Sequence, residues 1–343
     1  MRRWRALLAA GAAAPLLSGC IAAAVPVAAA GVVGKHELDR RHAKQEATEQ
    51  AQTPPALVRG PGVPPPGGLM ATKVPPSVQY LYGSAEAAAQ QRQTYLELAN
   101  FLIAKSSDRA VGHPVKSVVL APGSTLDQPV FEPCGDKPLA VVLDADETAI
   151  LNYGFEGDQV LRGGAYDQQR WNRWEQTGQG KVRPVPGVLD ALEVARQAGV
   201  TVVINSNRLA ANADATAATL KQAGLGSFTH LDTLWLSGDA GSGSGKDARR
   251  WAISAKYCVV AMVGDQLGDF SDLFNAPALG LKQRREALGT RDFEVMWGQG
   301  WFILPNPVYG TALKGDYGAV FPVETRWSDP AETQTPTPSG SAN

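Results

Sequence analysis

Between residues 78 and 327, short continuous apolar runs alternate with stretches whose apolar positions repeat at helical spacing. β-Branched and aliphatic runs predict strands at 116–123, 138–146, 200–207, 229–238 and 257–265. Helical periodicity predicts helices at 84–107, 187–199, 213–224, 246–256 and 267–276. Apolar strands that alternate with amphipathic helices are typical of an α/β fold with a Rossmann-like central parallel sheet covered by helices on both faces.

Acidic residues stand at the ends of two of these strands. Asp144, Asp146 and Glu147 lie at the end of the strand at 138–146, and Asp265 ends the strand at 257–265. Clustered carboxylates repel one another, so such a cluster indicates a bound cation or a chemical task. In open parallel sheets, ligands bind beyond the carboxyl ends of the strands, which is where these residues fall.

The first residues have the pattern of a targeting segment. A basic start and an apolar run over 6–16 precede the tetrapeptide Leu-Ser-Gly-Cys that ends at Cys20. This pattern resembles a bacterial lipoprotein signal, which implies cleavage after residue 19 and acylation of Cys20. An ordinary secretory signal and an uncleaved membrane span are the alternatives, because the apolar character continues to residue 34. By the same resemblance Ile21, which is not acidic, favours the outer membrane.

Composition places the folded part between two polar segments. Residues 20–77 are rich in Gln, Ala and Pro and are expected to form a tether, whereas residues 328–343 are expected to be a disordered tail. The domain is therefore expected at 78–327. A formal net charge of −1 over 343 residues, without a long basic stripe, does not favour a protein that binds nucleic-acid polymers.

Two cysteines remain after Cys20. Cys134 precedes the strand at 138–146, and Cys258 lies at the start of the strand at 257–265. If those strands are neighbours, the two sulfurs can meet in a disulfide, which an oxidising periplasm would preserve. Two separate buried thiols are the alternative, because the sequence does not fix the geometry that a disulfide needs.

Four short motifs occur in the order that is typical of the haloacid dehalogenase (HAD) superfamily. They are Asp-x-Asp-x-Thr from Asp144 to Thr148, a serine at Ser206, a lysine at Lys246, and Gly-Asp-x-x-x-Asp, which ends at Asp269. Each motif is weak by itself, but all four follow predicted strands or begin a helix in the expected order. The sequence therefore resembles a HAD-type enzyme.

The resemblance is narrower still, to the class C (bacterial lipoprotein) acid phosphatases. The stretches VVLDADETAILNY, INSNR, GKDARR, VGDQLGDF and FILPNPVYG carry it, together with a Trp-x-x-Trp pair in WNRWEQ and the lipoprotein signal. It covers about residues 78–317. One departure is Gly268, where relatives often carry an acid, and this leaves the role of that extra carboxylate open.

The resemblance implies a role for each motif residue. Asp144 is expected to be the nucleophile that forms an aspartyl-phosphate, and Asp146 the general acid and base. Asp144, Asp265 and the backbone carbonyl of Asp146 are expected to bind Mg²⁺, a cation that prefers oxygen ligands. The crowded carboxylates are expected to raise the pKa of Asp146, in keeping with an acidic optimum.

The remaining positions are expected to bind phosphate or support the site. The phosphate ligands are Ser206, Asn207 and Lys246. Thr148 and Asp269 are expected to support the metal and Lys246. Asp247 and Arg249 are expected to face solvent or brace their helix.

An insert after the first motif, at about residues 152–185, is expected to form a small, mainly helical cap. Tyr153 and Trp171 lie within it and are candidates to stack on a nucleobase or an aromatic leaving group, with cap packing as the alternative. The expected function is Mg²⁺-dependent hydrolysis of small phosphomonoesters, nucleoside 5′-monophosphates above all. A phosphotransferase or sugar-phosphate phosphatase, and a non-catalytic envelope binding lipoprotein, are the competing hypotheses. The expected location is the bacterial envelope through the lipid anchor alone, and a homodimer is left open.

Overall fold

β1 (Leu139–Leu143) lies at the centre of a parallel five-stranded sheet whose order is β5-β4-β1-β6-β7. The computed structural model describes residues 73–241 and 243–329. β4 (Thr201–Leu209) and β6 (Cys258–Gly264) pair with β1 on its two sides, and β5 (Leu234–Ser237) and β7 (Trp301–Ile303) form the edges. All five residues of β1 and all seven of β6 are buried, as expected for central strands of a parallel sheet.

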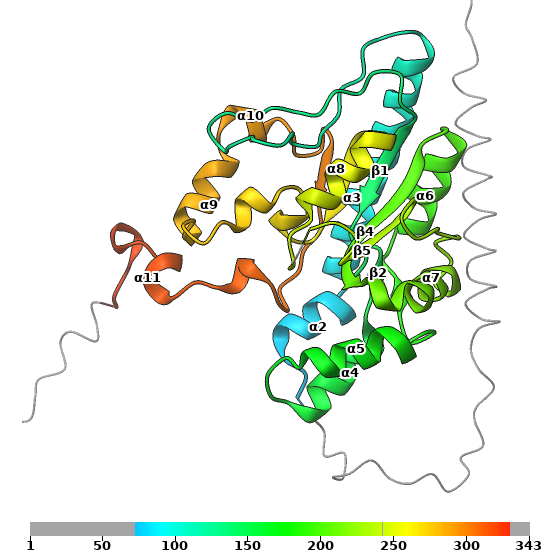
Figure 1. The fold of residues 1–343 in the computed structure, drawn as a ribbon. Coiled ribbons are helices and arrows are strands. Elements are labelled where there is room, and N and C mark those ends of the chain that lie inside the picture. Colours follow the sequence, from blue (N-terminus) through cyan, green and yellow to red (C-terminus); the bar gives the residue numbers. More distant parts are fainter. Residues whose placement is uncertain (1–72, 242, 330–343) are drawn as a thin grey trace, which may run out of the picture. The chain divides into compact units, whose positions relative to one another are not determined.

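Helices cover both faces of this sheet, and the α/β architecture expected from the sequence is confirmed. The α-helices and short 3-10 helices outside the cap are α2 (Pro76–Gly83), α3 (Ala85–Ala110), α6 (Val188–Gln197), η1 (Ala210–Asn212), α7 (Ala213–Gln222), α8 (Asp247–Lys256), η2 (Leu267–Asp269), η3 (Asp272–Asn275), α9 (Leu281–Leu288), α10 (Arg291–Glu294), η4 (Thr311–Leu313), α11 (Tyr317–Val320) and η5 (Val323–Thr325). Figure 1 shows α3, α6 and α8 around the strands, whereas α11 lies away from them, nearer to α9.

Alternate residues of β1 pack into two separate apolar cores. Val141 and Leu143 join the core that includes residues of α3, α6 and α7, whereas Ala140 and Val142 join the core on the opposite face, built with residues of α8, η3 and α10. This alternation follows from the two-residue period of a strand. Burial on both faces fixes the register of β1, and with it the position at which Asp144 leaves the sheet.

A small cap is inserted between β1 and α6. It contains α4 (Tyr153–Arg162) and α5 (Gln168–Thr177), and it is bracketed by the antiparallel pair β2 (Ile150–Leu151) and β3 (Arg183–Pro184). In Figure 1 the two cap helices lie together beside α2. The edge-to-face contact of Tyr82 in α2 with Tyr153 in α4, whose ring centroids are 5.1 Å apart, joins these elements.

Two predicted elements differ from the structure. The run at 116–123 is not a strand of the sheet. Val118, Val119 and Leu120 are buried, but the contacts of the run are single ones: Val118 N–H donates to Val259 O of β6 at 2.9 Å, and Leu120 forms an isolated bridge with Phe131. The predicted helix at 267–276 is instead the pair of 3-10 turns η2 and η3, because the side chain of Asp269 caps the first and that of Ser271 begins the second. Helix α2 and strand β7 were not predicted.

Cys134 lies in the loop before β1, and Cys258 lies on β6, the strand next to β1. Cys258, the first residue of β6, pairs in register with Leu139 of β1, and the sulfur of Cys258 is bonded to that of Cys134 in a disulfide with a Cα–Cα distance of 4.6 Å. The signal segment, Cys20, most of the tether and the tail from residue 330 lie outside the described residues. Within the part of the chain that the structure describes, no helix has both the length and the apolar character needed to span a membrane.

Candidate active site

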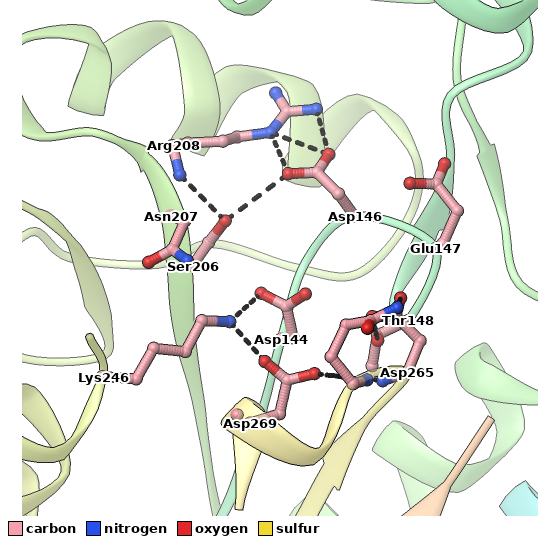
Figure 2. A network of polar contacts seen from close by, with 12 residues as sticks. Asp144, Asp146, Glu147, Thr148, Ser206, Asn207, Arg208, Lys246, Asp265 and Asp269 are labelled. Atoms are coloured by element: carbon pink, nitrogen blue, oxygen red, sulfur yellow. Dashed lines mark hydrogen bonds and ion pairs between the residues drawn. The ribbon is translucent and has the colours of Figure 1, made fainter. Parts of the chain in front are cut away.

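The carboxyl ends of β4, β1 and β6 bring together the residues of the four motifs. Asp144 follows β1, Ser206 lies near the end of β4, and Asp265 follows β6. Because β1 pairs directly with both neighbours, these three positions come from adjacent strands. Lys246, the residue before α8, reaches the same place (Figure 2).

Two carboxylates contact one ammonium group at the centre of the site, and a third carboxylate lies close to both of them. Lys246 Nζ lies 2.5 Å from Asp144 Oδ1 and 2.7 Å from Asp269 Oδ1, and its side chain is buried. Candidate ligand atoms of Asp144, Asp265 and Asp269 all lie within 4.8 Å of one another. Asp269 uses its second oxygen, Oδ2, to accept hydrogen bonds from the backbone N–H groups of Asp265 and Gln266. This contact fixes the carboxylate that holds Lys246.

Burial and mutual repulsion shift the protonation of this cluster. Burial first, and then the charge of Asp269, raises the pKa of Asp265 to about 7. Burial also raises the pKa of Asp144 well above its usual range, against the opposing effect of Lys246. Three ionised carboxylates and one ammonium group carry two net negative charges, so the unliganded cluster resists full ionisation.

The donor set fits a divalent cation of the Mg²⁺ type. The groups are hard carboxylate oxygens, and the two uncompensated negative charges match the charge of the ion. Asp265 is held in place by Thr148 Oγ1, which donates to its Oδ1 at 3.0 Å, and by Asn306 Nδ2, which donates to its Oδ2 at 2.7 Å. Hydrogen bonds of this kind orient a carboxylate toward a metal.

Asp146 is held apart from this cluster by a buried arginine. Arg208, fully buried in β4, donates from Nε to both Asp146 oxygens at 3.0 Å and from Nη2 to Oδ1 at 2.7 Å. Figure 2 shows Arg208 directed at Asp146, whereas Lys246 points at Asp144 and Asp269. Two N–H donors of one guanidinium fix the position of a carboxyl group. Arg208 therefore holds Asp146 next to Ser206.

Two of the expected phosphate ligands, Ser206 and Asn207, lie near the end of β4, whereas the third, Lys246, lies before α8. Ser206 is fully buried, and its Oγ lies 3.5 Å from Asp146 Oδ2. Asn207 uses its amide to donate to Ser244 O at 3.0 Å and to accept from Arg249 Nη2 at 2.5 Å. Arg249 is buried rather than solvent-facing, and it also donates to Ser206 O at 2.6 Å. Of the two expected roles, facing solvent or bracing its helix, the first is wrong for Arg249, which braces the strand end that carries Ser206.

Asp247 braces its helix together with Asp272. Asp247 accepts from Arg250 Nη2 at 2.5 Å, and the two carboxylate oxygens of Asp272 accept from the backbone N–H groups of Lys246 and Asp247 at 2.8 Å. Both contacts fix the start of α8. The loop before Lys246 therefore ends in an anchored position, although its composition is rich in glycine.

Glu147 points away from Lys246 in Figure 2 and is fully buried. Its carboxylate accepts from Tyr82 OH at 2.6 Å and from Tyr309 OH. Its backbone has a positive φ of 56°, which is uncommon for a residue with a side chain. Burial, followed by the charge of Asp146, raises the pKa of Glu147 to about 7. Glu147 thus joins α2 and the segment after β7 to the loop that carries Asp146.

The two candidate stacking residues have partners within the domain. Tyr153 is 42% exposed, and its hydroxyl donates to Tyr82 O at 2.6 Å. Trp171 packs edge-to-face on Phe155 with ring centroids 4.8 Å apart, and the Arg208 guanidinium lies 5.8 Å from its ring centre. Trp171 therefore packs in the cap while remaining close to the ion pair of Asp146.

Arg208, Asn152 and Arg249 are the site residues that sequence reasoning missed. Arg208 and Asn152 lie within the stretches INSNR and VVLDADETAILNY, but nothing in those stretches indicated their contacts with Asp146. The structure reveals their role through their burial, because charged and amide side chains are rarely buried without hydrogen-bond partners.

Comparison with known protein families agrees with this geometry. Residues 86–312 match the model of HAD superfamily subfamily IIIB, acid phosphatase. The chain belongs to this family. The match spans well over half of the chain and contains every motif residue described above, so the protein is an acid phosphatase of the HAD superfamily.

Solved structures give the same result. The class C acid phosphatase from Bacillus anthracis is similar at 25% sequence identity and a TM-score of 0.53, over 69% of this chain and 84% of that one. The structure of the Bacillus anthracis enzyme with tungstate bound is similar at 25% identity and a TM-score of 0.52, over 71% and 90% of the two chains. The fold of the acid phosphatase domain is therefore that of the class C enzymes.

Proposed function

We propose that this acid phosphatase uses Mg²⁺ to hydrolyse phosphate monoesters, with nucleoside 5′-monophosphates as its main substrate class, through a phosphorylated Asp144. The observation that supports this most directly is the cluster in which Lys246 Nζ lies 2.5 Å from Asp144 and in which Asp265 lies close to Asp144. Asp144, Asp265 and the backbone carbonyl of Asp146 would hold the ion, and Asp269 would support Lys246. Bound Mg²⁺ would offset the repulsion between the Asp144 carboxylate and the phosphoryl oxygens.

In the first step, an oxygen of Asp144 forms a bond to phosphorus while the bond from phosphorus to the leaving oxygen breaks. The protonated carboxyl of Asp146 gives its proton to the leaving oxygen, so that an alcohol departs. In the second step Asp146, now ionised, takes a proton from water as the water oxygen attacks phosphorus. Inorganic phosphate leaves, and the carboxylate of Asp144 is restored.

The remaining residues stabilise the charge on the phosphoryl group or orient the residues that do so. Lys246 and the hydroxyl of Ser206 face the nonbridging oxygens, where negative charge must be stabilised. Thr148 and Asn306 orient Asp265, and Asp269 orients Lys246. Asn207 supports this edge of the site through its contact with Arg249.

The preference for nucleotides is supported by the aromatic side chains near the cap. Tyr153 is partly exposed beside Tyr82, and Trp171 lies over Arg208, so flat apolar surfaces border the site from the cap side. A nucleobase or an aryl leaving group can stack on such surfaces. The tungstate in the Bacillus anthracis relative is a tetrahedral oxyanion like phosphate, which agrees with a phosphoryl site in the family.

The test is the release of phosphate from p-nitrophenyl phosphate, with Mg²⁺ and with EDTA, by the wild type and by Asp144→Asn. We expect turnover that EDTA abolishes and added Mg²⁺ restores, and no turnover by Asp144→Asn although its thermal unfolding remains cooperative. Absence of turnover under every condition would favour a binding lipoprotein. A kinetic screen of nucleotides, sugar phosphates and aryl phosphates then tests the substrate class, and transfer of phosphate to an added alcohol tests for a phosphotransferase.

We propose an envelope location through acylation of Cys20, supported by the signal-like sequence that precedes it. The full-length chain is expected to partition into a detergent phase when it is made in bacteria, and Cys20→Ser is expected to remain in the aqueous phase. Equal partitioning of the two chains would contradict the anchor. Whether the domain forms a homodimer is tested by measuring the molar mass of the purified domain by light scattering.

A further inference from the structure

A buried amide lies where the chain passes from the sheet into the cap. Asn152 follows β2, is the residue before α4, and has no exposed surface. Its Nδ2 donates to Asp146 Oδ1 at 2.9 Å and to Glu147 Oε1 at 2.9 Å. Its Oδ1 accepts from Arg208 Nη2 at 3.1 Å and from Trp174 Nε1 at 3.0 Å. Every polar atom of this side chain is therefore used, and each hydrogen bond fixes the orientation of the amide.

The contacts of Asp146 differ between its two oxygens. Oδ1 accepts from Asn152 Nδ2, Arg208 Nη2 and Arg208 Nε, which gives it three N–H donors. Oδ2 shares the single Arg208 Nε hydrogen at 3.0 Å and accepts from Ser206 Oγ at 3.5 Å, a hydroxyl that can rotate and accept a hydrogen bond instead. A proton on Oδ1 would collide with the hydrogens directed at it, so Oδ2 is the oxygen that can exchange a proton. Oδ2 is also the oxygen on the side of Ser206, where the phosphoryl group is proposed to bind.

Trp174 connects this arrangement to the cap. Its indole lies between two glycines: a Cβ on Gly154 would come within 2.8 Å of the Trp174 ring, and a Cβ on Gly178 would overlap it. The indole therefore has little room to move relative to α4 and to the end of α5. A displacement of the cap would lengthen or break the Trp174–Asn152 hydrogen bond. The Asn152 amide, which donates to Asp146 Oδ1, would then shift as well.

We propose that Asn152 is a positioning residue for Asp146: it holds Oδ1 so that Oδ2 faces the leaving oxygen, and Trp174 makes this orientation depend on the position of the cap. The inference rests on the proposed role of Asp146 as general acid and base. It adds that the cap contributes to proton transfer as well as to substrate contact. A misoriented carboxyl affects mainly those substrates whose leaving oxygen needs a proton.

The experiment compares an aryl phosphate, whose leaving phenolate departs without a proton, with an alkyl phosphate, whose leaving alkoxide requires one. Asn152→Ala is expected to lower kcat/KM roughly 100-fold more for the alkyl ester than for the aryl ester, the size of effect expected from a small misplacement of a catalytic group. Trp174→Phe keeps an aromatic ring at this position but removes the N–H donor together with one ring of the indole, so its thermal unfolding is measured alongside the kinetics. This variant is expected to lower kcat/KM for the alkyl ester by up to about tenfold more than for the aryl ester, which is the range expected for the loss of one hydrogen bond.

The control is Gln176→Ala, which lies on the same cap helix and removes a hydrogen bond to Asn212 at 3.1 Å without touching Asp146. It is expected to leave the ratio of the two substrates unchanged. Thermal unfolding of all variants reports on the fold. An equal loss for both esters in Asn152→Ala and Trp174→Phe, or no loss in either variant, would overturn the inference, because a purely structural role does not distinguish leaving groups.

Asp146→Asn separates the inference from the function on which it rests. If Asp146→Asn itself affects both esters equally, Asp146 is not the general acid, and the proposed mechanism fails together with the inference. If Asp146→Asn shows the split but Asn152→Ala and Trp174→Phe do not, the mechanism stands and only the positioning role of Asn152 fails.

Discussion

The buried carboxylate cluster makes a quantitative prediction about the stability of the metal-free protein. Asp265 has a pKa of about 7 in the folded chain, because burial and the nearby Asp269 disfavour its charge, whereas its ordinary value is 3.8. The folded state therefore holds a proton that the unfolded state releases. Stability from this group is fully present below pH 4 and is lost as the pH rises through 7.

The magnitude follows from the two pKa values. Linkage between 3.8 and 7 gives a fall of about 2 to 3 kcal/mol in the free energy of unfolding between pH 5 and pH 8 from Asp265 alone. Added Mg²⁺ is expected to recover stability, and to do so more at pH 8 than at pH 5, because protons compete with the ion for the same oxygens.

The assay is urea unfolding of the EDTA-treated protein at pH 5 and pH 8. Asp265→Asn cannot ionise and is expected to show a fall smaller by about 2 to 3 kcal/mol than that of the wild type. Asp127→Asn, which changes an exposed loop carboxylate, is expected to match the wild type. A metal-free wild type whose stability is constant or rises from pH 5 to pH 8 would refute the reasoning, as would an unaltered fall in Asp265→Asn.

Three further predictions follow from contacts in the domain. Lys246→Met is expected to lower kcat by roughly 100-fold or more, because it removes the only ammonium group of the described cluster, and steady-state kinetics would contradict this if kcat were unchanged. Replacement of both Cys134 and Cys258 by Ser removes a disulfide that joins residues 124 positions apart and restricts the unfolded chain. It is expected to lower the free energy of unfolding by about 5 kcal/mol. A loss below about 1 kcal/mol would contradict the assumption that the disulfide acts by restricting the unfolded chain. Gly178→Ala is expected to lower the free energy of unfolding by about 1 to 3 kcal/mol, because the added Cβ overlaps the Trp174 indole. The control is Gly157→Ala, in open space within a helix, which is expected to raise the free energy of unfolding by roughly 0.5 to 1 kcal/mol. Equal melting temperatures for the two variants would contradict this prediction.

The sheet was predictable because its central strands are uniformly apolar. Continuous runs such as Leu139–Leu143 can only be buried on both faces, and this requirement implies the parallel sheet and its covering helices. The run at 116–123 shows the limit of the argument. Its apolar residues do become buried, but hydrophobicity predicts burial rather than pairing, and this segment packs against the core without joining the sheet.

Local polar contacts account for the helix that was predicted wrongly. The stretch 267–276 has apolar residues at helical spacing, yet Asp269 accepts hydrogen bonds from the backbone of Asp265 and Gln266 and thereby closes a 3-10 turn. Gly268 lies in that turn against Asn275, where a Cβ would overlap the amide of Asn275. The absence of an acid at this position in the present chain therefore agrees with the packing.

The motif residues were predictable because each lies at the end of an apolar strand or before a helix, in a recognisable order. The partners of Asp146 were not, since Asn152 and Arg208 meet only after the cap has folded onto the sheet. Arg208 lies 62 residues from Asp146 along the chain, and its ion pair depends on burial that no local pattern reveals. The sequence thus predicts which groups react, whereas the fold shows what orients them.

In the proposed mechanism, Asp144 becomes phosphorylated during turnover. The most direct measurement is rapid acid quench of the enzyme with a radiolabelled phosphomonoester, followed by borohydride reduction and peptide mass spectrometry. The account predicts acid-stable label on the chain and conversion of residue 144 to homoserine, with neither in Asp144→Asn. Label on any other residue, or the same labelling in Asp144→Asn, would contradict it.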